Sequence, residues 1–140
     1  EKYFATYGKV KEFLDRTVED AKKNGYTVTM FGRRRPIPEL ASSNFMTRSF
    51  GERAAMNAPV QGTAADIIKI AMVRVNRRLK EEHLQSKLVL QIHDELIIET
   101  KKEELEIVQK ILVEEMMHAA DLAVPLLVDA NVGDSWFDAK

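Results

Sequence analysis

The sequence lacks several features that would assign a chain to a class at once. It contains no cysteine, which excludes disulfide bonds and thiolate metal sites. It has no apolar run near the ~20 residues that a membrane-spanning helix needs, so no membrane partner is expected. Residues 1–4 include neither an initiator methionine nor a signal-peptide pattern, and we interpret this start as a cut inside a longer protein. The chain also has no excess of one charge, since its formal net charge is −1.

The composition that is present favours a folded protein. Of the 140 residues, 45% are hydrophobic and 31% are charged, which suits one domain, or one piece of a larger domain, with a core. The near-neutral charge argues against a large nucleic-acid-binding surface, but the charges are uneven. Residues 33–35 are all arginine, whereas residues 94–115 are rich in glutamate and aspartate. This uneven distribution is compatible with a local basic face.

Hydrophobic spacing in the first half predicts two helices around a strand. A helix is expected over residues 3–23 and should end at Asn24-Gly25. Residues 26–31 are β-branched and aromatic, which predicts a strand followed by a turn that holds the three arginines. A long helix is expected over residues 47–81. Pro59 should kink or break it near residues 55–58, and Thr63 with Asp66 should cap its restart.

The second half predicts a hairpin, a helix and a last strand. Residues 87–99 form two strands around a turn, with Leu88, Leu90 and Ile92 on one face. Thr100 and Glu103 form a capping box for the next helix. The residues expected to be buried by that helix are Leu105, Val108, Leu112, Met116 and Ala119. Residues 126–132 alternate like a strand. This order of elements predicts an α+β fold, with helices packed on an antiparallel sheet.

Two adjacent acids, Asp94 and Glu95, lie in the expected turn of the hairpin. Carboxylates with waters and phosphates are the ligands that Mg²⁺ prefers, and two such ions can assist phosphoryl transfer. On spacing alone, however, an ordinary solvated turn between strands, where acids are common, is the favoured interpretation. The neighbouring His93 has no second histidine nearby in sequence to form a zinc site.

Two further patterns are compatible with nucleic-acid binding. Arg53, Asn57 and Gln61 recur every four residues and share one helix face, where they suit a phosphate contact and hydrogen bonds to base edges. An ordinary polar helix face has the same pattern. The arginines at 33–35 repel one another, and a phosphate backbone would neutralise them, although a solvated basic turn explains them equally well.

Three segments, in their order and spacing, resemble the C-terminal part of the palm of family A, bacterial-type DNA polymerases. They are MFGRRR at residues 30–35, ERAAMNAPVQGTAAD at 52–66 and QIHDE at 91–95. The ending GDSWFDAK, residues 133–140, is similar to the natural C-terminus of that family. The resemblance covers essentially the whole chain, and the segment at residues 52–66 is its most specific part.

The resemblance implies roles for the residues of the hairpin. Asp94 would be a ligand of the catalytic metals, which are two Mg²⁺ ions in the complete enzyme. Glu95 would lie beside the catalytic site and contribute less directly. His93 would contact the primer end.

The resemblance also implies DNA contacts for the first half of the chain. Arg53, Asn57 and Gln61 would lie along the bound duplex and contact template and primer. Arg35, the third arginine of the turn, would approach the template strand. Primer-template DNA and dNTP are then the expected partners of the full-length enzyme, a cytoplasmic, nucleoid-associated protein of DNA replication and repair.

The chain departs from the family pattern in what it does not contain. The second metal-binding aspartate and the fingers helix that grips the triphosphate are absent from these 140 residues. The chain is therefore expected to be a single C-terminal fragment, residues 1–140, comprising palm with the adjoining helix 3–23, and to be inactive in isolation. Without the upstream strands, an exposed sheet edge would allow the fragment to self-associate.

Three other functions remain open. One is a non-specific DNA-binding module without catalysis. Another is a metal-dependent hydrolase that uses Asp94 and Glu95, with Glu99 as the nearest further acid. The third is a single-subunit RNA polymerase, in which the family pattern has serine at the position of Glu95.

Overall fold

The computed structural model describes residues 6–139. They form two compact units, the first up to Ala64 and the second from Ala65 onward, and helix α3 has its first part in one unit and its second part in the other. Helices combine with two separate two-stranded antiparallel sheets, so the predicted α+β class is confirmed. Within residues 6–139, none of the helices has the length and apolar character needed to cross a membrane.

The first helix is α2, Gly8–Asn24. It confirms the predicted helix from Gly8 onward, whereas residues 3–5 of that prediction lie outside the described residues. The helix ends where expected, because Gly25 takes a left-handed conformation with φ of 79° and its N–H donates to the Ala21 carbonyl at 2.8 Å. Glycine adopts this conformation without a Cβ clash.

A short ribbon follows α2. Strand β1, Tyr26–Val28, pairs antiparallel with β2, Arg34–Pro36. The predicted strand over 26–31 is too long, because the chain already turns at Thr29, whose carbonyl accepts the Gly32 N–H at 2.9 Å. Gly32 has φ of 83°, a left-handed conformation that favours glycine. The turn therefore precedes the arginines, and two of them belong to β2.

Helix α3, Phe45–Glu81, follows the 3-10 helix η1, Pro38–Ala41. It begins two residues earlier than predicted, since Asn44 Oδ1 accepts the N–H groups of Met46 and Thr47 at 2.9 and 3.2 Å. Pro59 was predicted to kink or break this helix, and the break is wrong, because the helix continues through it. Proline removes one helical hydrogen bond, but burial of the neighbouring Ala58 and of Ala55 one turn earlier opposes that loss.

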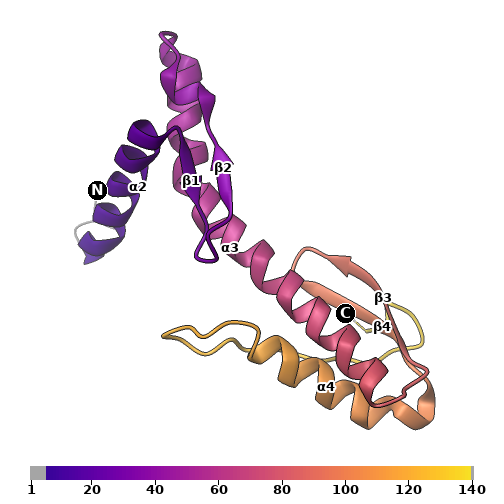
Figure 1. Ribbon diagram of the computed structural model, residues 1–140. Coiled ribbons are helices and arrows are strands. Elements are labelled where there is room, and N and C mark those ends of the chain that lie inside the picture. The colour runs from indigo at the N-terminus through magenta and orange to yellow at the C-terminus, as the bar shows by residue number, and fades with distance from the viewer. Residues whose placement is uncertain (1–5, 140) are drawn as a thin grey trace. The chain divides into compact units, whose positions relative to one another are not determined.

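The core of the first unit lies among α2, η1 and the first part of α3. Figure 1 shows strands β1 and β2 beside this part of α3. Its buried residues are Val18, Ala21, Ile37, Leu40 and Ala55. Gly51 permits a close approach here, since a Cβ on it would lie 3.0 Å from the backbone nitrogen of Leu40. The helix α3 is thereby seated on η1.

The second unit contains a hairpin. Strand β3, Lys87–Ile92, pairs antiparallel with β4, Glu95–Glu99. The register shifts between Leu88 and Leu90, which is a β-bulge. The bulge interrupts the alternation that was predicted, so Leu88 and Ile92 are half-buried while Leu90 is 44% exposed.

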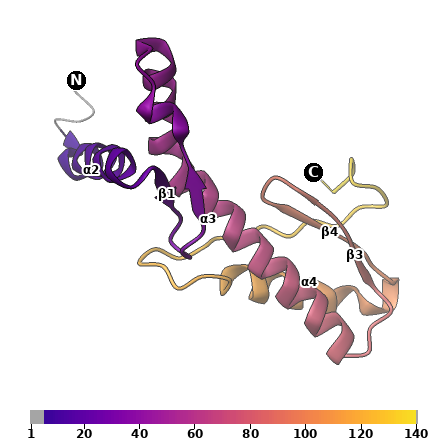
Figure 2. The ribbon, with the colours of Figure 1, turned by 45° about the horizontal axis from the view of Figure 1, so that its top comes forward.

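Helix α4, Leu105–Met117, lies beside the second part of α3, as Figures 1 and 2 both show. The core of this unit is formed by residues of both helices and of β4, and it is centred on Val75, Leu96, Val108 and Ile111. Of the predicted α4 residues, Val108 and Ala119 are buried, and Leu105, Leu112 and Met116 are half-buried. The fully buried Ile111 was missed.

The predicted capping box at Thr100 and Glu103 is wrong. A 3-10 turn, η2, Lys102–Glu104, precedes α4, and no side chain caps either helix. Thr100 Oγ1 instead donates to the Ile98 carbonyl at 3.2 Å, within the end of the hairpin. The hydroxyl is therefore used by the strand rather than by the helix.

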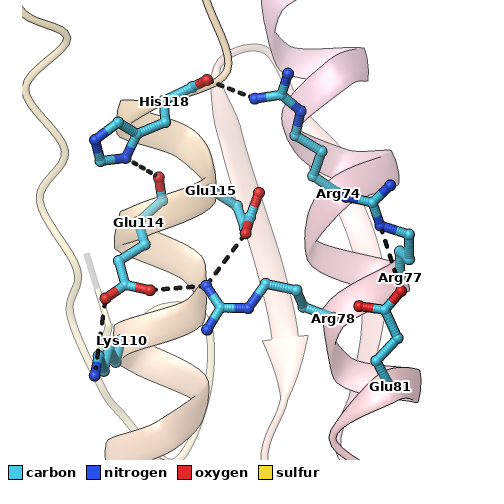
Figure 3. Close-up of polar contacts among 8 residues, drawn as sticks. All are labelled: Arg74, Arg77, Arg78, Glu81, Lys110, Glu114, Glu115 and His118. Atoms are coloured by element: carbon cyan, nitrogen blue, oxygen red, sulfur yellow. Dashed lines mark hydrogen bonds and ion pairs between the residues drawn. The ribbon is translucent and has the colours of Figure 1, made fainter.

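Charged side chains also join α3 and α4 (Figure 3). Arg78 Nη1 donates to Glu114 Oε2 at 2.7 Å and to Glu115 Oε1 at 3.2 Å. Arg74 Nη1 donates to the His118 carbonyl at 2.5 Å. The hydrogen bond from Arg78 lowers the pKa of Glu114, and the same contact raises the pKa of Arg78. The two helices are thus fixed side by side by a polar network as well as by the core.

The predicted last strand over 126–132 is wrong, because these residues form no strand. Its alternation is real, since Leu126, Val128 and Ala130 are half-buried and Leu127 is 88% exposed. A strand requires a neighbouring backbone, however, whereas the Ala130 carbonyl accepts its hydrogen bond from a side chain, Gln109 Nε2, at 3.1 Å.

Candidate nucleic-acid and metal sites

The hairpin of the second unit ends in a two-residue turn, His93 and Asp94. Ile92 pairs with Glu95 at the end of the ladder, so Glu95 begins β4 and does not lie in the turn as predicted. His93 has φ of 53°, which few residues other than glycine, asparagine, aspartate and histidine adopt. Gln91 Nε2 donates to the His93 carbonyl at 2.6 Å. The turn conformation is therefore held by a side chain that precedes it.

The two carboxylates at this turn have different surroundings. Both Asp94 and Glu95 are exposed, and Trp136 Nε1 donates to Glu95 Oε2 at 3.3 Å. The tryptophan lies 41 residues further along the chain, so no local spacing in the sequence predicts this contact. Glu95 thus has one oxygen engaged by Trp136, while Asp94 lies at the exposed tip.

A complete metal site is not formed by this turn. Across residues 6–139, three or more His, Cys, Asp or Glu side chains nowhere gather as they would around a metal ion. Mg²⁺ in phosphoryl-transfer sites usually takes one or two protein carboxylates and completes its shell with waters and substrate phosphates. Asp94 and Glu95 fit such a shared site, and they do not fit a site that protein ligands alone complete.

The hairpin is anchored at its other end by Glu104. Its carboxylate accepts the N–H groups of Gln85 and Ser86 at 3.0 and 2.9 Å and the Ser86 hydroxyl at 2.6 Å. The backbone hydrogen bond from Gln85, followed by that from the Ser86 hydroxyl, lowers the pKa of Glu104. Ser86 Oγ in turn accepts the Lys101 N–H at 3.1 Å. Both strand ends are therefore joined to the start of α4.

In the first unit, the predicted helix face exists. Arg53, Asn57 and Gln61 are exposed on α3, while Ala55 and Ala58 are buried between them in sequence. Because Pro59 does not break the helix, the spacing of four residues is preserved along the whole face. Arg53 Nη1 donates to Ser49 Oγ at 3.3 Å, one turn earlier.

A charge pair lies on the same part of α3. Lys22 Nζ of α2 lies 2.5 Å from Glu52 Oε1, and this hydrogen bond lowers the pKa of Glu52. The acid next to Arg53 is thereby neutralised by a lysine of the same unit. The positive charge of Arg53 is then less opposed by its neighbour.

The three arginines at 33–35 have three different environments. Arg33 Nη2 donates to the Gly62 carbonyl at 2.9 Å, and Arg34 lies over the Tyr26 ring with its Cζ 4.8 Å from the centroid. Two of the three arginines, Arg33 and Arg34, therefore have partners within the first unit, so neither is simply part of a solvated basic turn. Arg35, which was singled out for the template, is exposed on β2.

A small cavity with a volume of about 70 Å³ lies between the ribbon and α3. Arg35 and Gln61 both line it. Its lining also includes Thr27, Thr29, Arg33 and Gly62. The ribbon is attached beside it, because the Met30 N–H donates to Thr63 Oγ1 at 3.0 Å. Thr63 is thus a ribbon contact, and the predicted cap of a restarted helix is wrong.

The seven predicted site residues therefore form two groups. His93, Asp94 and Glu95 lie together at the hairpin turn of the second unit, whereas Arg35, Arg53, Asn57 and Gln61 belong to the first unit. Two neighbouring residues were not predicted. Thr27 lines the cavity with Arg35 and Gln61, and Trp136 donates a hydrogen bond to Glu95.

Known proteins that are similar to this chain point to one family. A model described as DNA polymerase family A matches residues 1–138. DNA polymerase I of Geobacillus stearothermophilus is 51% identical over 140 residues, which is 100% of this chain and 16% of that protein. DNA polymerase I of Bacillus subtilis is 52% identical over the same shares of both chains. The chain thus spans about a sixth of the length of these relatives.

A solved structure is also similar. It is the POL domain of Pol1 from M. smegmatis, in complex with DNA primer-template and dNTP. It is 47% identical in sequence, with a TM-score of 0.96, and the match covers 99% of this chain and 24% of that chain. The resemblance found from the sequence motifs is confirmed, and the chain belongs to DNA polymerase family A.

Proposed function

We propose that this chain is the C-terminal palm part of a DNA-directed DNA polymerase, which transfers nucleotides from dNTP to a primer 3′ end as directed by a template. The observation that carries the proposal is the hairpin turn at His93-Asp94, which holds a carboxylate at its exposed tip in a chain of this family. The complex of the M. smegmatis relative with primer-template and dNTP supports it.

Asp94 is proposed as the direct metal ligand. One oxygen of Glu95 accepts a hydrogen bond from the Trp136 indole, which orients the carboxylate toward that ring. Glu95 therefore contributes to the site less directly than Asp94. A further carboxylate from outside these 140 residues must complete the site, since Asp94 and Glu95 are consecutive residues of one hairpin. Mg²⁺ held in this way would stabilise the charge that develops on the attacking and leaving oxygens.

The first unit is proposed to contact DNA. Arg53 has a guanidinium exposed on α3, which suits a phosphate oxygen. Asn57 and Gln61 present amides on the same face, and amides in the minor groove can hydrogen-bond the acceptors that every base pair presents there. These contacts sense duplex shape with little sequence preference, as a polymerase requires.

Arg35 and His93 complete the proposed set of contacts. Arg35 is assigned to the template strand, because its neighbours Arg33 and Arg34 are engaged by Gly62 and Tyr26. His93 is assigned to the primer end, because the turn exposes its side chain next to Asp94.

Primer extension by the natural full-length gene product tests the proposal. We expect extension that copies the template, needs dNTP and Mg²⁺, and stops when a chelator is added. A matched reaction with a non-complementary dNTP should give no product. Salt-sensitive binding of duplex DNA with no extension would instead favour a DNA-binding module without catalysis.

A further inference from the structure

Thr27 has a buried hydroxyl without a partner. Its side chain is 5% exposed, and Oγ1 is buried and makes no hydrogen bond within the described part of the chain. A buried hydroxyl that is left without a hydrogen bond is costly, and such groups in native proteins usually bind an ordered water. The hydroxyl therefore points to a water site beside β1.

The small cavity beside Thr27 has the size and polarity for such a water. Its volume of about 70 Å³ exceeds the ~10–15 Å³ that a single water needs, and its lining includes Arg35 and Gln61. Thr27 and Arg35 are direct partners in the β1–β2 register, which places their side chains on the same face of the ribbon. Gln61 reaches the cavity from α3.

The walls of this cavity are held in place. Arg33 Nη2 donates to the Gly62 carbonyl at 2.9 Å, and a Cβ on Gly62 would lie 2.6 Å from Thr29 Cγ2. The ribbon and α3 are thus in close contact beside Thr27. By contrast, Arg35 and Gln61 are exposed and show no side-chain hydrogen bond to another described residue. Long side chains of this kind lose conformational entropy when they are ordered on binding.

We propose that Thr27 is a positioning residue, which orients Gln61 and Arg35 for duplex DNA through an ordered water bound in this cavity. This inference rests on the proposed function, since it gives Gln61 and Arg35 their role. Each of the three groups can form a hydrogen bond with this water. The Arg35 guanidinium donates to the water, and the water donates to the Gln61 amide oxygen. The third hydrogen bond joins the water to the Thr27 hydroxyl, which can act as donor or acceptor. The two DNA-contacting groups are thereby partly ordered before DNA binds.

Two variants of the natural full-length protein test the proposal. Thr27→Val keeps the shape of the side chain and removes the hydroxyl, whereas Thr27→Ser keeps the hydroxyl. We expect Thr27→Val to raise the Kd for primer-template about tenfold, the equivalent of one lost hydrogen bond. The maximal rate of extension at saturating DNA should not change, and Thr27→Ser should restore the Kd. Equal Kd values for wild type and Thr27→Val would overturn the proposal.

A double-mutant cycle separates positioning from a general effect on the fold. In the Gln61→Ala background, Thr27→Val should change the Kd much less than it does in the wild type, because the amide that the water orients is already gone. Additive effects of the two substitutions would overturn the coupling.

The water itself is tested without DNA, so that a failure of the proposed function is distinguishable. We expect a crystal structure grown without phosphate or sulfate to show a water within hydrogen-bond distance of Thr27 Oγ1. Thr27→Val should then lower the Tm, because a satisfied hydroxyl is lost. A dry cavity, or a Tm that rises in Thr27→Val because an unsatisfied hydroxyl has been removed, would overturn the inference even if the protein extends primers.

Discussion

Gly62 and Thr29 are in contact at the point where the β1–β2 ribbon meets helix α3. A Cβ atom on Gly62 would lie 2.6 Å from Thr29 Cγ2, which is closer than two such atoms can approach. The methyl belongs to a short β-branched side chain, which has little freedom to move away. The absence of a side chain at Gly62 therefore sets the distance between the ribbon, with Arg35, and the helix face, with Gln61.

Substitution of Gly62 by alanine should destabilise the first unit. Alanine favours the helix by up to ~1 kcal/mol over glycine, but overpacking costs about 1–3 kcal/mol, so we expect a net loss. Gly8→Ala is the matched control, since nothing lies within 4 Å of a Cβ on Gly8. Thermal unfolding of both variants decides the point, and a Gly62→Ala variant as stable as Gly8→Ala would contradict the close contact.

Arg53→Ala should weaken duplex DNA binding and reduce its salt dependence. Loss of one phosphate contact should lower the slope of log K against log[salt] by about 1. Arg16→Ala, on the exposed face of α2, removes the same charge without a proposed contact and should leave the slope almost unchanged. Equal slopes for wild type and Arg53→Ala would exclude the phosphate contact.

The elements that the sequence predicted well are those with local signals. Helix α2 ends where Asn24-Gly25 predicted, and the hairpin over 87–99 has the expected strands. The turn at His93-Asp94 was placed within one residue, although no glycine marks it. In each case a hydrophobic period or a left-handed residue is visible over a few positions.

The errors arose where distant residues decide the local structure. The helix continues through Pro59 because Ala55, one turn earlier, is buried in the core of the first unit. Thr63 accepts a hydrogen bond from the Met30 N–H, 33 residues away. Likewise, the contact of Trp136 with Glu95 spans 41 residues. The strand predicted over 126–132 has the right alternation but lacks a paired backbone, which no single segment reveals.

The stability of the second unit should depend on pH through Glu104. Its pKa is lowered from 4.5 by hydrogen bonds from Gln85 and Ser86, so its carboxylate stabilises the fold above pH 4.5 and loses this effect as the pH falls through the lowered pKa. Glu104→Gln should therefore lower the Tm at pH 7, and the difference from wild type should shrink as the pH falls through the lowered pKa of Glu104.

Glu106→Gln is the control for this comparison, because Glu106 is exposed in the first turn of the same helix α4. We expect its substitution to change the Tm less than that of Glu104 at pH 7. A Tm difference between wild type and Glu104→Gln that grows on acidification would contradict the assigned direction of the pKa shift.

The isolated 140-residue chain should not extend a primer at any Mg²⁺ concentration. It supplies two consecutive acids of one hairpin, Asp94 in the turn and Glu95 at the start of β4, whereas in-line phosphoryl transfer needs a further carboxylate and cationic groups on the triphosphate. Weak, salt-sensitive binding of duplex DNA through Arg35 and Arg53 is still expected. Extension by the purified chain that disappears in an Asp94→Asn control would show that the chain holds a complete site.

The central claim is that Asp94 is the metal ligand of this hairpin, and primer extension by Asp94→Asn in the natural full-length protein tests it most directly. Asparagine keeps the shape and removes the charge, so turnover should fall by about 10³-fold or more while the Kd for primer-template stays nearly the same. Glu95→Gln should do less damage, because part of that carboxylate is engaged by Trp136. Near-normal extension by Asp94→Asn, or a larger loss in Glu95→Gln, would contradict the claim.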